Sequence, residues 1–164
     1  SGTKVRDKDA ILAALMTAEV AAYYSLRGMT LLDGLEELFQ KFGYYLETVK
    51  SYTLYGAEGM AKIAAAMEGL RKNPPEQIFD RRIQAVRDYS EGFRLQNGEK
   101  TPIDLPKSNV LYYELGGGDW LCVRPSGTEP KLKVYAGASE STKEGAKQRV
   151  ESYVSAANTL LGMD

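Results

Sequence analysis

The spacing of apolar residues changes near Arg81, and this change constrains the fold more than any other feature of the sequence. Before Arg81, apolar residues recur three and four positions apart, as on one face of a helix. After it, short apolar and aromatic runs are separated by turn residues, as in strands. This order predicts an α+β fold in which two helices cover a mainly antiparallel sheet.

Two helices are expected before the tyrosine-rich segment that begins at residue 44. The first starts at a capping Asp7 or Asp9 and runs to about residue 26. The second starts at Thr30, where Asp33 three residues later gives a weak form of the capping box. A pair of helices is marginal on its own, so this helical hairpin is expected to need a partner surface.

The rest of the chain is expected to form the sheet and its helices. Val49 and residues 52–55 favour an extended segment, and Asn73-Pro-Pro75 ends the helix that follows it. Strands are predicted at residues 82–89, 108–115, 120–123 and 132–136, and helices at residues 58–71 and 141–161. Gly116-Gly-Gly118 is interpreted as a tight turn, because neither the dinucleotide nor the Walker spacing of glycines is present.

A polar loop at residues 124–131 lies between the last two predicted strands. Arg124 can form a forked pair with two phosphate oxygens. Ser126 and Thr128 can each donate a hydroxyl hydrogen bond, and Gly127 lets a backbone N–H approach an anion. The same residue types are common in ordinary turns, so composition alone also fits a simple hairpin connection.

Composition excludes several classes of protein. Hydrophobic residues make up 43% and charged residues 26% of 164, which is typical of a globular domain. The net charge is -1, so no nucleic-acid partner is expected, and no apolar run approaches the ~20 residues that span a membrane. The sequence contains no histidine, which excludes Ser-His-Asp and Cys-His catalysis. Cys122 is the single cysteine, expected as a small buried hydrophobe, and the lack of disulfides fits a cytoplasmic protein.

Residues 124–131 together with Leu132-Lys-Val-Tyr135 resemble the C-terminal phosphate-binding loop of the α-D-phosphohexomutases, the phosphoglucomutase and phosphomannomutase family. Residues 3–10 also resemble the segment that opens a helix near the end of the third of four domains in that family. The resemblance implies that residues 1–49 are the helical C-terminal remnant of that third domain. It also implies that residues 50–164 are the C-terminal phosphate-binding domain, with a fold like the TATA-box-binding protein.

The resemblance further implies an activity and a role for particular residues. The parent enzyme would interconvert glucose 1-phosphate and glucose 6-phosphate through a phosphoserine and glucose 1,6-bisphosphate, assisted by Mg²⁺. This loop would hold the substrate phosphate that is not transferred. The phosphate-binding residues carried over from the family are Arg124, Ser126, Gly127, Thr128 and Lys133. Glu129 is expected to point away from the phosphate, toward Lys131.

Lys8 matches a family lysine that can face the active site, and a solvated lysine in the first helical turn is an equally open reading. The family's phosphoserine, magnesium and sugar-selecting motifs do not occur in the sequence. The chain is therefore expected to be a fragment with no catalytic residue and no metal ligand of its own, inactive alone, whose partners are a phosphosugar and the missing N-terminal domains. A phosphomannomutase or phosphoglucosamine mutase fragment remains an alternative, as does a stand-alone phosphosugar-binding module without catalysis.

Overall fold

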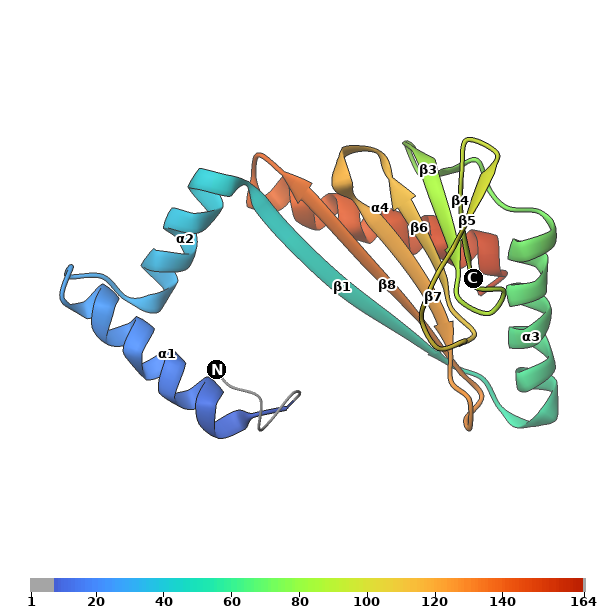
Figure 1. Ribbon diagram of the computed structural model, residues 1–164, viewed down its shortest axis with the longest axis horizontal. Coiled ribbons are helices and arrows are strands. Elements are labelled where there is room, and N and C mark those ends of the chain that lie inside the picture. Colours follow the sequence, from blue (N-terminus) through green and yellow to red (C-terminus); the bar gives the residue numbers. More distant parts are fainter. Residues whose placement is uncertain (1–7, 164) are drawn as a thin grey trace. The chain divides into compact units, whose positions relative to one another are not determined.

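The computed structural model describes residues 8–163 and divides between Gly43 and Tyr44 into two units. Figure 1 shows helices in the first unit and the sheet in the second. The boundary predicted after residue 49 lies inside strand β1 (Tyr44–Thr53). The division falls earlier because β1 pairs along its whole length with a strand of the second unit.

The first unit contains the expected helical hairpin. Helix α1 (Ala10–Ser25) begins at Asp9, whose carboxylate accepts a hydrogen bond from a backbone N–H of the first turn. Helix α2 (Leu31–Phe42) begins at Thr30, which forms a complete capping box with Asp33. Both predicted helix starts thus coincide with side-chain caps.

Within residues 8–163, the strands form an eight-stranded sheet in which all pairs are antiparallel. The spatial order is β1, β8 (Lys131–Glu140), β7 (Trp120–Pro125), β6 (Leu111–Leu115), β3 (Arg81–Asp88), β4 (Phe93–Gln96) and β5 (Glu99–Pro102). Strand β2 (Gln77–Ile78) pairs with the start of β3. This confirms the predicted α+β class.

Helices α3 (Gly56–Lys72) and α4 (Lys143–Leu161) share a single hydrophobic core with one face of the sheet. Figure 1 shows α4 running behind the strands. Alternate residues of β6, β7 and β8 are buried in this core. The residues between them lie on the opposite side, here called the open face: Tyr112, Glu114, Trp120, Cys122, Arg124, Lys133 and Tyr135.

The sequence prediction missed several parts of the sheet, including the short strand β2. The β4–β5 hairpin lies where a loop was expected, and Asn97 and Gly98 form its turn, both with positive φ. The N-terminal half of β1 was also missed, because its exposed residues alternate with only half-buried ones.

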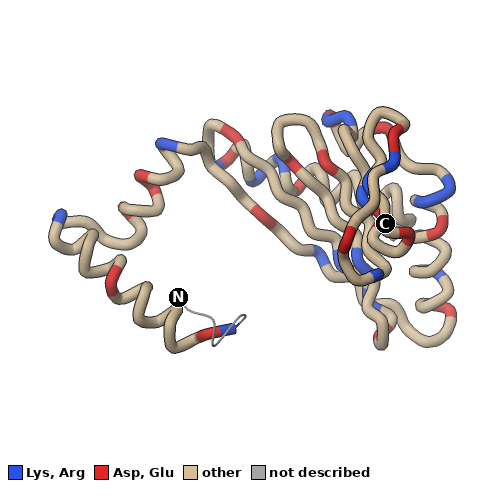
Figure 2. The backbone as a smooth tube through the Cα atoms, in the orientation of Figure 1, with Lys and Arg blue, Asp and Glu red and all other residues tan. Residues whose placement is uncertain are grey.

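Charged residues of both signs are spread over the chain, and Figure 2 shows them interspersed along the backbone. None of the helices in residues 8–163 is long and apolar enough to cross a bilayer.

Candidate functional site

The loop between β7 and β8 is closed by hydrogen bonds before any ligand arrives. The Ser126 N–H donates to the Lys131 carbonyl at 2.8 Å. The Ser126 hydroxyl oxygen accepts the N–H groups of Thr128 at 3.4 Å and Glu129 at 3.3 Å. Because the oxygen accepts these bonds, the hydroxyl hydrogen remains able to donate to an anion. The loop is therefore preorganised, which lowers the cost of ordering it on binding.

The structure brings the five predicted phosphate-binding residues around one hollow of about 310 Å³. The residues that line it are Arg124, Pro125, Ser126, Gly127, Thr128, Glu129, Lys131 and Lys133. Arg124 and Lys133 are cross-strand partners on the open face, so both cations project from the same side of the sheet.

The electrostatics of this hollow favour an anion. Its lining contains three cationic side chains and one carboxylate, and the carboxylate of Glu129 accepts a hydrogen bond from Lys131 at 3.1 Å. Glu129 thus pairs with Lys131 as expected from the sequence, although it also lines the hollow, and its orientation away from a phosphate stays a prediction. Arg124 and Lys133 remain as the cations that a phosphate would meet.

Lys131 was not among the predicted site residues, although it lines the hollow and occupies the first position of β8. The sequence could have indicated it, since Lys131 is the only lysine in residues 124–131.

A second hollow of about 300 Å³ borders the same loop from the side of α3. Met60, Ile63 and Ala64 of α3 line it, together with residues 108–110 and 124–127. Sequence could not reveal this neighbourhood, because it joins three segments far apart in the chain.

Lys8 lies in the first unit, directly before the Asp9 cap of α1, and is exposed. Its placement toward an active site stays a prediction.

Cys122 is half-buried on the open face rather than fully buried in the core. Burial raises the pKa of the thiol to about 11, and nearby Arg124 lowers it only in part. The thiol is therefore protonated at neutral pH, which makes it a poor nucleophile.

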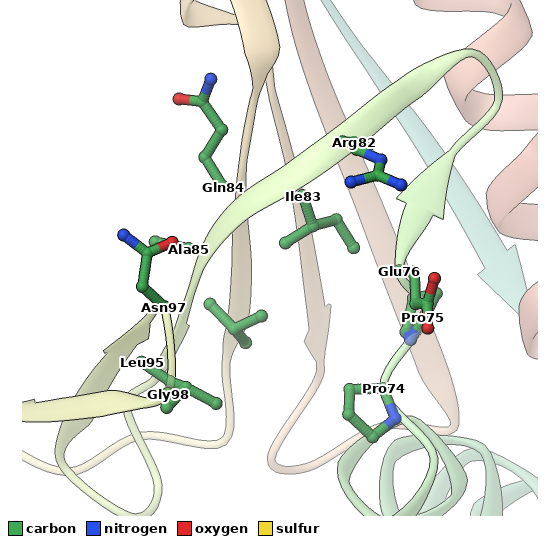
Figure 3. A pocket seen from close by; sticks show the side chains of 11 residues that line it. Pro74, Pro75, Glu76, Arg82, Ile83, Gln84, Ala85, Leu95, Asn97 and Gly98 are labelled. Carbon is green, nitrogen blue, oxygen red and sulfur yellow. The ribbon is translucent and has the colours of Figure 1, made fainter.

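A larger hollow of about 480 Å³ lies along β3, where residues 82–86 line it (Figure 3). Pro74, Pro75 and Glu76 line it on one side, and Asn97 and Gly98 of the β4–β5 turn line it on another. None of the predicted phosphate-binding residues lines it, so its size does not make it the candidate site.

Comparison with known proteins decides the family. The model of the phosphoglucomutase/phosphomannomutase C-terminal domain matches residues 57–153. The chain belongs to this family.

Among curated relatives, the phosphoglucomutases of Staphylococcus aureus strains bovine RF122 / ET3-1 and MRSA252 are each 37% identical over 152 residues. These residues are 92% of this chain, and the chain spans 27% of the length of each relative. The resemblance seen in residues 124–135 is thus confirmed over most of the chain.

A solved structure shows the same fold at low sequence identity. The open form of the exocytosis-sensitive phosphoprotein pp63/parafusin from Paramecium, a phosphoglucomutase, superimposes with a TM-score of 0.63 at 15% identity. The match covers 97% of this chain and 28% of that one. At this identity the likeness supports the architecture alone.

Proposed function

We propose that this chain is the phosphate-clamping portion of a phosphoglucomutase, in which the β7–β8 loop holds the substrate phosphate that is not being transferred. The observation that carries the proposal is the convergence of Arg124, Ser126, Gly127, Thr128 and Lys133 on one preorganised hollow, in a domain of the phosphoglucomutase/phosphomannomutase family. The named relatives favour the glucomutase over the mannomutase.

The chemistry of the clamp follows from its side chains. The Arg124 guanidinium would form two parallel N–H···O bonds, and Lys133 beside it would act as a point charge. Ser126 and Thr128 would donate hydroxyl hydrogens, and Gly127 would present its N–H. Gripping a remote phosphate positions the reacting end of the sugar, which lowers the entropy cost of reaching the transition state.

The rest of the reaction belongs to the proposed parent enzyme. A phosphoserine there would exchange a phosphoryl group with the hexose through glucose 1,6-bisphosphate. Residues 8–163 bring together no cluster of three His, Cys, Asp or Glu side chains that could hold a metal ion, so they do not fit the Mg²⁺ of that enzyme and no step here uses it.

The proposal extends to the organisation of the parent. The part of the chain before Tyr44 would be the end of its third domain and the part from Tyr44 its fourth, in place of the predicted division into residues 1–49 and 50–164. The parent would be a cytoplasmic enzyme whose upstream domains carry the chemistry. The 27% of each relative that the chain spans supports this. The isolated chain is therefore expected to give no glucose 6-phosphate from glucose 1-phosphate in a coupled assay.

Phosphate titration followed by backbone amide NMR tests the clamp. Shifts should cluster at residues 124–133, with a dissociation constant on the order of mM, because the sugar contacts are absent. Arg124→Ala should weaken binding roughly tenfold, the loss of a charge-assisted pair worth about 1.4 kcal/mol.

Arg82→Ala is the matched control, because Arg82 lines the distant hollow of Figure 3. The loop would be shown to be a simple turn if Arg124→Ala bound phosphate as tightly as the unmodified chain does. The same would follow if phosphate shifted the amides of lysines scattered over the chain.

A further inference from the structure

Helix α3 approaches the end of β1 unusually closely, and a glycine makes this approach possible. Gly59 in the first turn of α3 is buried. A Cβ placed on Gly59 would lie 2.7 Å from Leu54 Cβ and 3.1 Å from the Leu54 carbonyl carbon. Contacts between Cβ and carbon below about 3.0 Å are not tolerated in packed proteins, so any larger residue would displace one partner.

Of the two partners, the helix is held more firmly than Leu54. Helix α3 is anchored in the core by Ile63, Met67 and Leu70, whose exposed fractions are 4%, 1% and 6%. Leu54 is itself packed against this core and follows directly after β1. The helix and the strand end therefore fix each other's position.

Leu54 is in turn bonded to the phosphate loop. Its N–H donates to the Pro130 carbonyl at 2.8 Å. This bond extends the β1–β8 pairing one residue beyond the Thr53–Lys131 pair, into the loop itself. Pro130 has no N–H, so its carbonyl is the group through which its backbone can be held.

The loop thus has two attachment points. The Ser126 N–H to Lys131 carbonyl bond closes it across its base, and the Leu54 to Pro130 bond holds the segment that leads into Lys131. Thr128 and Glu129, whose N–H groups bond the Ser126 hydroxyl, lie between the two attachments. A shift of Leu54 would consequently move the part of the loop that lines the hollow.

We infer that Gly59 and Leu54 are positioning residues for the phosphate site. They act by transmitting the fixed position of α3 to Pro130, and neither of them lines the hollow. The inference rests on the proposed phosphate clamp and adds to it the element that holds the clamp in shape.

Two substitutions in the same helix test this. Gly59→Ala introduces the Cβ that meets Leu54, whereas Gly69→Ala adds a Cβ with nothing within 4 Å. Both raise helix propensity equally, so a difference between them reports the contact with Leu54. We expect phosphate to bind Gly59→Ala roughly fivefold more weakly, equivalent to about 1 kcal/mol, and Gly69→Ala as the unmodified chain does. Urea unfolding of each variant establishes that the titrated protein is folded.

Hydrogen exchange distinguishes a local effect at Leu54 from general destabilisation, because general destabilisation would raise exchange rates throughout the sheet. In Gly59→Ala this amide should exchange faster while amides of β6 and β7 stay protected, and Gly69→Ala should leave it unchanged. In the unmodified chain, saturating phosphate should slow its exchange, which keeps the test decisive even if Gly59→Ala does not fold.

The outcomes separate the two proposals. If the unmodified chain binds phosphate at residues 124–133 and Gly59→Ala binds it equally well, the positioning role is wrong and the clamp stands. Exchange of the Leu54 amide that is indifferent to phosphate also overturns the positioning role. If the unmodified chain binds no phosphate at this loop, both proposals fail.

Discussion

Ser126 shows how one side chain organises this loop. Its hydroxyl oxygen accepts two backbone N–H groups that would otherwise point to solvent, and its own N–H closes the base of the loop. This arrangement competes well with extended structure because a serine hydroxyl reaches amides two and three residues ahead. The residue thus shapes the loop and also faces the hollow.

Ser126→Ala should weaken phosphate binding roughly tenfold, because it removes one donor to the anion and two internal bonds of the loop. Ser155→Ala, which changes an exposed serine of α4, is the control. The same NMR titration measures both variants. A Ser126→Ala variant with unchanged affinity and unchanged amide shifts at Thr128 and Glu129 would contradict this role.

The residue scale is also where the sequence was most informative. Arg124, Ser126, Gly127 and Thr128 lie within five positions, so their convergence follows from a short turn whatever the rest of the chain does. Lys133 was added through the family resemblance alone, and the pairing of β7 with β8 places it opposite Arg124. Leu54 and Gly59 could not be found this way, since their proposed role depends on the Leu54–Pro130 hydrogen bond across the fold.

Among the elements, the open face contains a charged cluster that stabilises the centre of the sheet. Glu114 of β6 accepts hydrogen bonds from Arg87 of β3 at 2.6 Å and from Arg94 of β4 at 2.8 Å. The Arg94 bond, more than the Arg87 bond, lowers the pKa of Glu114 to about 2 despite an opposing contribution from burial. The cluster therefore joins the β4–β5 hairpin to the rest of the sheet.

This cluster predicts a pH dependence of stability. The folded-state pKa of Glu114 lies below its ordinary value of 4.5, so its stabilising contribution is complete above about pH 4.5 and is lost as pH falls toward 2. The free energy of unfolding should fall between pH 6 and pH 3 in the unmodified chain. In Glu114→Gln this fall should be smaller by only about 1 kcal/mol, because the cluster is partly solvated.

Urea unfolding at a series of pH values measures this. Glu47→Gln is the matched control, because Glu47 is exposed and lies in the same cross-strand row through Gly137 and Trp120. Identical pH profiles for Glu114→Gln and the unmodified chain would show that the cluster contributes nothing.

Two of the errors in the predicted strands have physical causes. The Asn97-Gly98 pair is a strong hairpin signal, but β5 consists of four exposed residues and has no apolar alternation to mark it. Strand β8 continues beyond the predicted end at residue 136, through Gly137 to Glu140. Gly137 is required there because a Cβ would lie 2.3 Å from the Trp120 indole nitrogen.

For the whole molecule, the two units differ in how much each buries. No residue of α1 is buried, and Ile11 is 86% exposed, whereas Leu132 and Val134 at the centre of the sheet are 0% exposed. The predicted need for a partner surface thus matches the exposed apolar side chains of α1. The order of elements and the α+β class could be predicted because helical and strand patterns are separated in the chain.

Amide hydrogen exchange should be faster in α1 and α2 than in β6, β7 and β8, because local opening exposes little additional apolar surface in the first unit. Sedimentation at the same concentration controls for association through the exposed apolar side chains. Equal protection of both units in a monomer would contradict this expectation.

A crystal of the chain grown with selenate would locate the phosphate clamp. Selenate is a tetrahedral oxyanion like phosphate, and its selenium can be located by anomalous scattering. The predicted result is a selenium peak in the hollow between β7 and β8, with selenate oxygens within hydrogen-bond distance of the Arg124 guanidinium and of the Ser126 and Thr128 hydroxyls. Selenate bound elsewhere on the chain, with no peak beside Arg124 at a concentration that saturates the NMR shifts, would contradict the account.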